Sequence, residues 1–149
     1  MYIQRTIEKS IDRANKFFPV VLVTGPRQVG KTTVLQNCET QPRTYVSLDT
    51  LENRELAKND PTLFLQRYPA PVLIDEIQYA PELFPYIKAS VDKEKKNGMY
   101  WLTGSQQFHL MKNVSESLAG RVGILQLEGL SQDEKNGHPD VPPLSLIHI

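Results

Sequence analysis

The sequence predicts an α/β fold in which a parallel sheet of about five strands carries helices on both faces. Short apolar segments rich in β-branched residues alternate along the chain with longer segments whose apolar residues recur every three or four positions. Parallel strands require long crossover connections, and helices that cover both faces of the sheet provide them. No apolar run approaches the ~20 residues that a membrane-spanning helix needs.

The elements follow in a regular order. A helix is expected over 3–17, where apolar residues lie on one face and Pro19 ends the pattern. The apolar runs that read as strands lie at 19–25, 44–49, 71–76, 99–104 and 122–128. The segments of helical type lie at 31–39, 51–60, 61–68, from Pro81 to Gly98, and in two short pieces at 106–114 and 115–120.

The end of the chain differs from the rest. Residues 131–149 have no hydrophobic period and contain three prolines, and the last six residues resemble the translation of a common sequencing-library adapter. We therefore expect a core domain over 1–130 and an irregular tail over 131–149 that is a truncation or non-native. A chain of 149 residues is long enough for one domain with a full hydrophobic core.

Charge and cysteine content exclude several classes of protein. Lys plus Arg and Asp plus Glu both number 17, and the pI is near 6.8, so the charge does not support nucleic acid as a partner. The single Cys38 excludes a disulfide framework and a cysteine-based zinc site within the chain. It suits a reducing compartment, and we expect a cytoplasmic protein without a membrane anchor.

A phosphate-binding loop is the strongest motif. Residues 25–32 match the pattern G-x-x-x-x-G-K-[ST], and they are Gly25, Pro26, Arg27, Gln28, Val29, Gly30, Lys31 and Thr32. The motif follows an apolar strand and precedes a helical run, so its backbone N–H groups can surround the phosphates of a nucleotide. Lys31 supplies a charge for the β- and γ-phosphates, the Thr32 hydroxyl can bind Mg²⁺, and Thr33 is placed to reach the α-phosphate.

Two carboxylates end the third predicted strand. Asp75 and Glu76 follow the apolar residues 72–74, and at the carboxyl edge of a parallel sheet they would face the phosphate loop. Asp75 can hold Mg²⁺, directly or through water. Glu76 can orient a water for attack on the γ-phosphate. Gln78 is predicted either to bind near the γ-phosphate or to cap the next helix, and the pattern does not choose.

Polar residues after the fourth strand are candidate sensors. Thr103 or Ser105 would lie beside the attacking water if that strand runs between the first and third strands. The alternative for Ser105 is an ordinary helix cap. Arg121 precedes the fifth strand and is a candidate arginine finger for a neighbouring subunit of a homo-oligomer, or else a surface partner of a carboxylate.

The combined motifs resemble a known family. The segments GPRQVGKTT, VLIDEIQYAPELFPYIK, WLTGSQQFHLM and SESLAGRV, in this order, resemble the AAA+-type P-loop ATPases of bacteria and archaea in which a C-terminal domain of unknown function follows the ATPase domain. The resemblance covers about residues 1–134. It implies a three-layer P-loop sandwich of the ASCE type, ATP and Mg²⁺ as cofactors, Asp75 and Glu76 as the Walker B pair, Thr103–Gln106 as the sensor segment, and Arg121 in an arginine-finger position. It also implies a helical lid and a C-terminal domain after Leu130, which this sequence lacks.

We compare three functional interpretations of the sequence. The first is an Mg-dependent ATPase. The second is a nucleotide-gated interaction module that binds ATP with little turnover and controls a missing C-terminal domain. The third, a GTPase, requires base-recognition and switch motifs, and residues 57–60 and the segment after Asp75 match neither.

Overall fold

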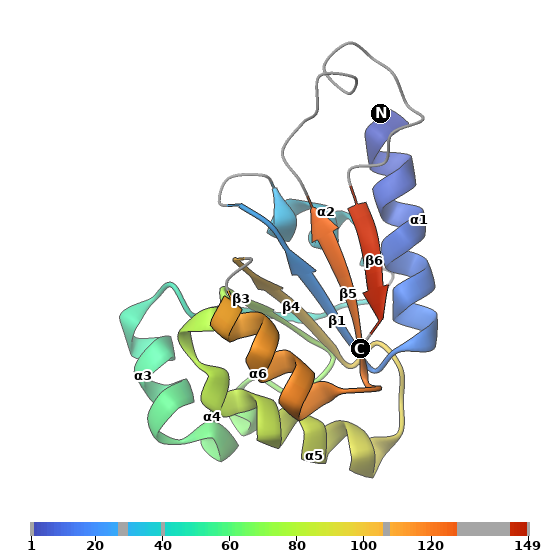
Figure 1. Ribbon diagram of the computed structural model, residues 1–149. Helices are drawn as coiled ribbons and strands as arrows, with labels where there is room; N and C mark the ends of the chain where they lie inside the picture. The colour runs from blue at the N-terminus through green and yellow to red at the C-terminus, as the bar shows by residue number, and fades with distance from the viewer. Residues whose placement is uncertain (1, 27–29, 40, 106–107, 128–143, 149) are drawn as a thin grey trace.

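The computed structural model describes residues 2–26, 30–39, 41–105, 108–127 and 144–148, which form one six-stranded sheet with helices on both faces (Figure 1). The strands are β1 (Val20–Thr24), β2 (Thr44–Ser47), β3 (Val72–Asp75), β4 (Tyr100–Gly104), β5 (Val122–Leu127) and β6 (Leu144–His148). The helices are α1 (Tyr2–Phe17), α2 (Lys31–Asn37), α3 (Leu51–Asn59), α4 (Pro61–Arg67), α5 (Phe84–Glu94) and α6 (Phe108–Leu118), with 3₁₀ turns η1 (Ile77–Tyr79) and η2 (Pro81–Leu83).

The strand order is β2-β3-β4-β1-β5-β6, and β1 to β5 are mutually parallel. The predicted parallel sheet of five strands is therefore confirmed. Strand β4 runs between β1 and β3, which is the position that the sensor interpretation required. The carboxyl ends of these three strands consequently meet at one edge of the sheet.

Alternating side chains of the central strands pack into two separate cores. Val20 and Leu22 of β1 contribute to the core under α3, α4, α5 and α6, whereas Val21 and Val23 contribute to the core under α1 and α2. All five residues of β1 are buried, as a strand covered on both faces requires. Figure 1 shows α1 on one face of the sheet and α3 to α6 on the other.

The structure differs from the expected elements in two places. The two helical pieces expected at 106–114 and 115–120 belong to one helix, α6, because Leu110, Val114 and Leu118 repeat on its buried face. Residues 144–148 form β6, antiparallel to β5, where an irregular tail was expected; the other tail residues, 131–143 and 149, lie outside the described residues. Among the described helices, none has the length and apolar character required to cross a membrane.

Candidate nucleotide-binding and catalytic site

The predicted phosphate loop leaves the carboxyl end of β1 through a glycine that no other residue can replace without rearrangement. A Cβ atom at Gly25 would lie 2.1 Å from the carbonyl oxygen of Leu127, at the end of β5. The Gly25 N–H also donates to Gly104 O at 3.3 Å, at the end of β4. The start of the loop is thus packed between the two strands that flank β1.

The loop enters helix α2 through Gly30, whose φ of 82° lies in the left-handed region. Among the described residues, no atom lies within 4 Å of a Cβ built at Gly30, so the backbone conformation, and not lack of space, favours glycine there. Arg27, Gln28 and Val29, which were expected to bind the cofactor, lie outside the described residues. Pro26 and Thr33 are exposed.

Lys31 begins α2 and its side chain turns back along the loop. The residue is only 5% exposed, and its ammonium group donates to the carbonyl oxygens of Gly25 and Pro26, each at 3.0 Å. A buried cation requires such hydrogen bonds, because the loss of hydration would otherwise destabilise the charged form. The contacts place the lysine charge beside the end of β1, against the first two residues of the loop.

Asp75 is the centre of a polar cluster that joins four elements. Its Oδ1 accepts hydrogen bonds from the hydroxyls of Thr32, at 2.7 Å, and of Thr103. Its Oδ2 accepts from the phenol of Tyr45 at 3.1 Å. The hydroxyl of the phosphate loop and the carboxylate of the acidic pair, 43 positions apart in sequence, are therefore in direct contact.

Glu76 follows Asp75 in a backbone conformation that few residues adopt. Its φ of 62° and ψ of 51° are left-handed, a region that is costly for residues other than glycine and is often occupied at functional sites. Its N–H donates to Thr103 Oγ1 at 3.0 Å, and its Oε2 accepts from the Gln78 amide at 2.5 Å. The turn ends the strand and directs the chain into η1.

Several of the predicted site residues therefore meet at the carboxyl edge of the sheet. Thr32, Asp75, Glu76 and Thr103 are linked there by the contacts given above, and Ser105 joins them through its N–H, which donates to Gln78 Oε1 at 3.3 Å. Lys31 is held separately, by the carbonyl oxygens of Gly25 and Pro26. Of the two expectations for Gln78, the helix cap is wrong, since η2 and α5 have no side-chain cap and Gln78 instead bridges Glu76 and Ser105. Binding near the γ-phosphate stays a prediction.

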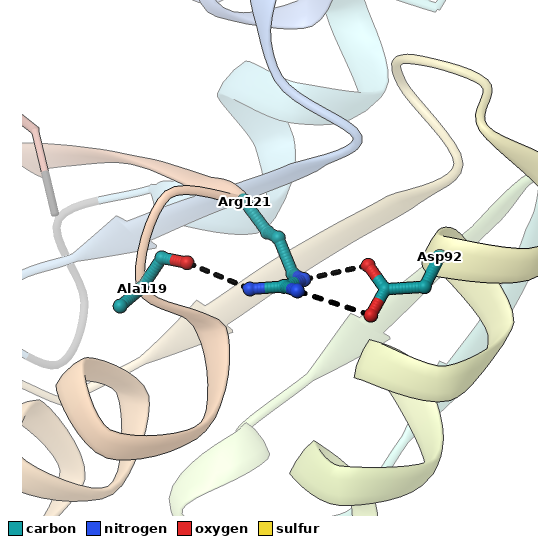
Figure 2. Close-up of polar contacts among 3 residues, drawn as sticks. All are labelled: Asp92, Ala119 and Arg121. Atoms are coloured by element: carbon teal, nitrogen blue, oxygen red, sulfur yellow. Dashed lines mark hydrogen bonds and ion pairs between the residues drawn. The ribbon is translucent and has the colours of Figure 1, made fainter.

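Arg121 lies at the opposite edge. Its carbonyl oxygen accepts a hydrogen bond from the N–H of Val20, the first residue of β1. The phosphate loop instead follows Thr24, the last residue of that strand. Figure 2 shows its guanidinium group bound to both carboxylate oxygens of Asp92, at 2.6 and 3.0 Å, and to Ala119 O at 2.9 Å. The hydrogen bonds to Asp92 raise the pKa of Arg121 and lower the pKa of Asp92. Arg121 therefore forms a surface ion pair with a carboxylate, which was the alternative expected for it if it is not an arginine finger.

Tyr45 is the site residue that sequence reasoning missed. It lies on β2, and the motifs do not reveal that β2 is the neighbour of β3. Partial burial, and then the adjacent Asp75 carboxylate, raise the pKa of the Tyr45 phenol, so the hydroxyl stays protonated and donates. Tyr45 is the second residue of the strand predicted at 44–49. An aromatic residue there does not indicate a functional contact, because β-branched and aromatic residues are common in strands.

A surface cavity of about 840 Å³ lies away from these residues. Its lining includes Pro71, Met99 and Tyr100, which precede or begin β3 and β4, so it opens at the amino edge of the sheet. None of the predicted site residues lines it. Size alone therefore does not locate the site, whereas the converging hydroxyl, ammonium and carboxylate groups do.

Comparisons with known proteins identify the family of the chain. Residues 17–136 match the family described as AAA domain. The uncharacterized protein Rv2008c of Mycobacterium tuberculosis and the uncharacterized protein Mb2031c of Mycobacterium bovis are each 37% identical over 130 residues, which cover 86% of this chain and 29% of the relative. The chain thus spans less than a third of the length of these curated relatives.

The fold is also similar to a crystal structure of a DNA replication initiation factor, with a TM-score of 0.51 and 11% identity, over 89% of this chain and 46% of the other. At that identity the likeness concerns the fold alone. The family match covers most of the chain and includes the phosphate loop, the acidic pair and the segment after β4. The chain therefore belongs to the AAA domain family, and it has the architecture of a nucleotide-binding, ATPase-like domain.

Proposed function

We propose that this domain binds ATP together with Mg²⁺ and hydrolyses it. The observation that carries the proposal is the 2.7 Å hydrogen bond from Thr32 Oγ1 to Asp75 Oδ1, because it joins the phosphate loop to the acidic end of β3. A lysine ammonium group at the end of β1, together with a hydroxyl and a carboxylate in contact, is a donor set suited to a polyphosphate with a bound cation. The neighbouring strands β1, β3 and β4 hold these groups in place.

The donor set fits magnesium. Thr32 and Asp75 offer a hydroxyl and a carboxylate oxygen in contact with one another, and Mg²⁺ prefers oxygen ligands and retains water and phosphate oxygens as its others. Within the described part of the chain, no group of three or more His, Cys, Asp and Glu side chains is arranged to hold a metal, so a protein-only metal cage is not part of the proposal. Bound there, Mg²⁺ would neutralise charge on the phosphates.

Hydrolysis would depend on how the chain orders its polar groups. Lys31 would stabilise negative charge on the phosphates, and Glu76 would accept a proton from the attacking water and orient it. Thr103 holds both the Asp75 carboxylate and the Glu76 N–H, which fixes the two acids relative to one another. Ser105 has a buried hydroxyl that meets no hydrogen-bond partner among the described residues, and it would be available to a group that arrives at this edge.

Oligomer formation is a separate proposal. As an arginine finger, Arg121 would act on the nucleotide of a neighbouring subunit, and it would first have to leave Asp92. The exposed position of this ion pair makes that exchange energetically accessible, since solvent-exposed pairs contribute little to stability.

A nucleotide-gated interaction module is the second candidate. The chain spans only 29% of the curated relatives, so a larger protein would contain further parts for such a module to control. In addition, the carboxylate of Glu76 is engaged by Gln78. This candidate predicts stoichiometric retention of ATP with little turnover.

Calorimetry and a turnover assay test the proposal. Mg²⁺ and ATP should produce binding heat with the wild-type chain and none with Lys31→Ala, whereas Lys58→Ala, at an exposed lysine paired with Glu82, should bind like the wild type. Glu76→Gln should keep binding and lose turnover. Absence of heat from any nucleoside triphosphate with folded protein would overturn the proposal, and full turnover by Glu76→Gln would refute the role given to that residue.

A further inference from the structure

The side-chain amide of Gln78 connects the predicted catalytic carboxylate to the segment after β4. Its Nε2 donates to Glu76 Oε2 at 2.5 Å, and its Oε1 accepts from the Ser105 N–H at 3.3 Å. A carboxylate only accepts and a backbone N–H only donates, so the two partners fix the orientation of the amide without ambiguity. The amide is planar, and a movement at one of its ends therefore displaces the other.

The surrounding backbone is shaped for this bridge. The left-handed turn at Glu76 starts η1, and the fully buried Ile77 anchors that turn in the core. Gly104 leaves the necessary space, because a Cβ atom there would lie 3.2 Å from Gln78 Oε1 and 2.8 Å from Leu110 Cδ2. A larger residue at position 104 would displace either the amide or the core side chain. The bridge thus depends on two separate parts of the sequence, the turn at Glu76 and Ile77 and the glycine at position 104.

Ser105 has a second polar group, its side-chain hydroxyl, that a ligand or a water molecule could satisfy. Its Oγ is buried without a hydrogen-bond partner among the described residues. A buried hydroxyl left unpaired costs free energy unless a ligand or water satisfies it. The N–H of the same residue is bound to Gln78. Ser105 therefore has one polar group held by the bridge and another that no described residue satisfies.

We propose that Gln78 is a positioning residue that couples the orientation of Glu76 to the Ser105 segment when nucleotide binds. The inference rests on the proposed function, since it takes Glu76 as the group that orients the attacking water. As the Glu76 carboxylate turns toward that water, its hydrogen bond to Gln78 changes. The same amide then changes its bond to the Ser105 N–H. The backbone at Ser105 thereby responds to the orientation of the Glu76 carboxylate.

Amide NMR of the ¹⁵N-labelled full chain tests the coupling without need of turnover. With Mg²⁺ and a non-hydrolysable ATP analogue, the wild-type Ser105 amide should shift and exchange its proton about tenfold faster, the effect expected for one lost hydrogen bond. In Gln78→Ala, this amide should exchange faster before nucleotide is added and should not respond to it. The amides of Lys31 and Thr32 should report binding equally in both proteins. Gln66→Ala, at an exposed glutamine on α4, is the matched control and should behave as the wild type.

The outcomes separate the inference from the function on which it rests. If Lys31 and Thr32 respond to nucleotide and Ser105 does not, or if Ser105 responds normally in Gln78→Ala, the coupling is refuted and ATP binding stands. If Lys31 and Thr32 do not respond in the wild type, ATP binding itself fails, and the inference falls with it.

Turnover gives an independent readout. Gln78→Ala should lower kcat about tenfold with KM for ATP changed less than twofold, because Gln78 positions Glu76 and does not itself bind the nucleotide. Gln78→Glu keeps the size of the side chain but removes the donor, so it should show the same loss if the alanine variant does not fold. Wild-type kcat in either variant, or a rise in KM that accounts for the whole loss, would overturn the proposal.

Discussion

Replacement of Thr103 by valine tests the link between the two acids without any nucleotide. Thr103 is fully buried, and its hydroxyl donates to Asp75 and accepts from the N–H of Glu76. Valine has nearly the same shape but neither hydrogen bond. The Asp75 carboxylate would keep its donors Thr32 and Tyr45, whereas the part-buried Glu76 N–H would lose the acceptor shown in the structure.

The expected loss of stability follows from these contacts. An unsatisfied buried N–H costs about 1–3 kcal/mol, and the lost hydrogen bond to a charged group costs about 1.5–3 kcal/mol, although the remaining donors to Asp75 reduce the second value. We therefore expect Thr103→Val to lower the free energy of unfolding by about 3 kcal/mol, which in a domain of this size corresponds to a decrease in Tm of about 6–12 °C. Thr103→Ser keeps the hydroxyl and removes a methyl group, and it should cost only about 1 kcal/mol.

Urea unfolding at neutral pH provides the measurement. Trp101, the single tryptophan, is 2% exposed and is a natural fluorescence probe of the core. The two variants should unfold with the same m-value as the wild type, so that differences in midpoint report stability. If Thr103→Val were as stable as the wild type, or if the serine variant lost as much as the valine variant, the argument from the hydroxyl would be wrong.

Two further predictions concern ionisable groups outside this cluster. Burial, and then the charges of Glu8 and Asp12, raise the pKa of the Cys38 thiol from 9.0 to about 11, so at pH 8 the thiolate should be about 100-fold less populated than in the unfolded chain. Alkylation by iodoacetamide, followed by mass spectrometry, should therefore be about 100-fold slower in folded than in urea-unfolded protein. Equal rates would contradict this. Arg121 lowers the pKa of Asp92 below 3.8, so the ionised carboxylate stabilises the fold above that pH and the contribution disappears as the pH falls through the lowered value. Asp92→Asn should therefore slightly lower the urea midpoint at pH 7. The difference in midpoint from the wild type should vanish at acid pH and decrease as salt is added. A difference that does not change with pH would show that the ion pair with Arg121 does not cause it.

The sequence predicted the sheet and most of the site because both depend on local patterns. The buried strands are uniformly apolar, and the phosphate loop is a contiguous motif whose neighbours on either side are a strand and a helix. Asp75 and Glu76 were located by their position at the end of such a strand. The parallel topology then places them at the same edge as the loop.

The contacts of the site that the sequence did not predict depend on which strands are neighbours and on backbone angles. Local sequence patterns predict neither of these. Tyr45 reaches Asp75 only because β2 pairs with β3. Gln78 was expected near the phosphate or at a helix cap, and its bridge to Ser105 requires the left-handed turn at Glu76. Arg121 has an ordinary carboxylate partner from α5, a contact between elements that sequence spacing does not connect. The strand at 144–148 was missed because its flanking segment has no hydrophobic period.

The left-handed conformation of Glu76 has a consequence for how such a domain could lose its activity. This backbone geometry costs most residues about 1–2 kcal/mol and is tolerated best by glycine and asparagine. A glycine at this position would therefore keep the turn, relieve its strain and leave the proposed phosphate loop unchanged. A β-branched replacement would remove the same carboxylate but disturb the entry into η1. If the proposed hydrolysis is correct, the backbone geometry at Glu76 thus makes loss of hydrolysis separable from loss of the fold.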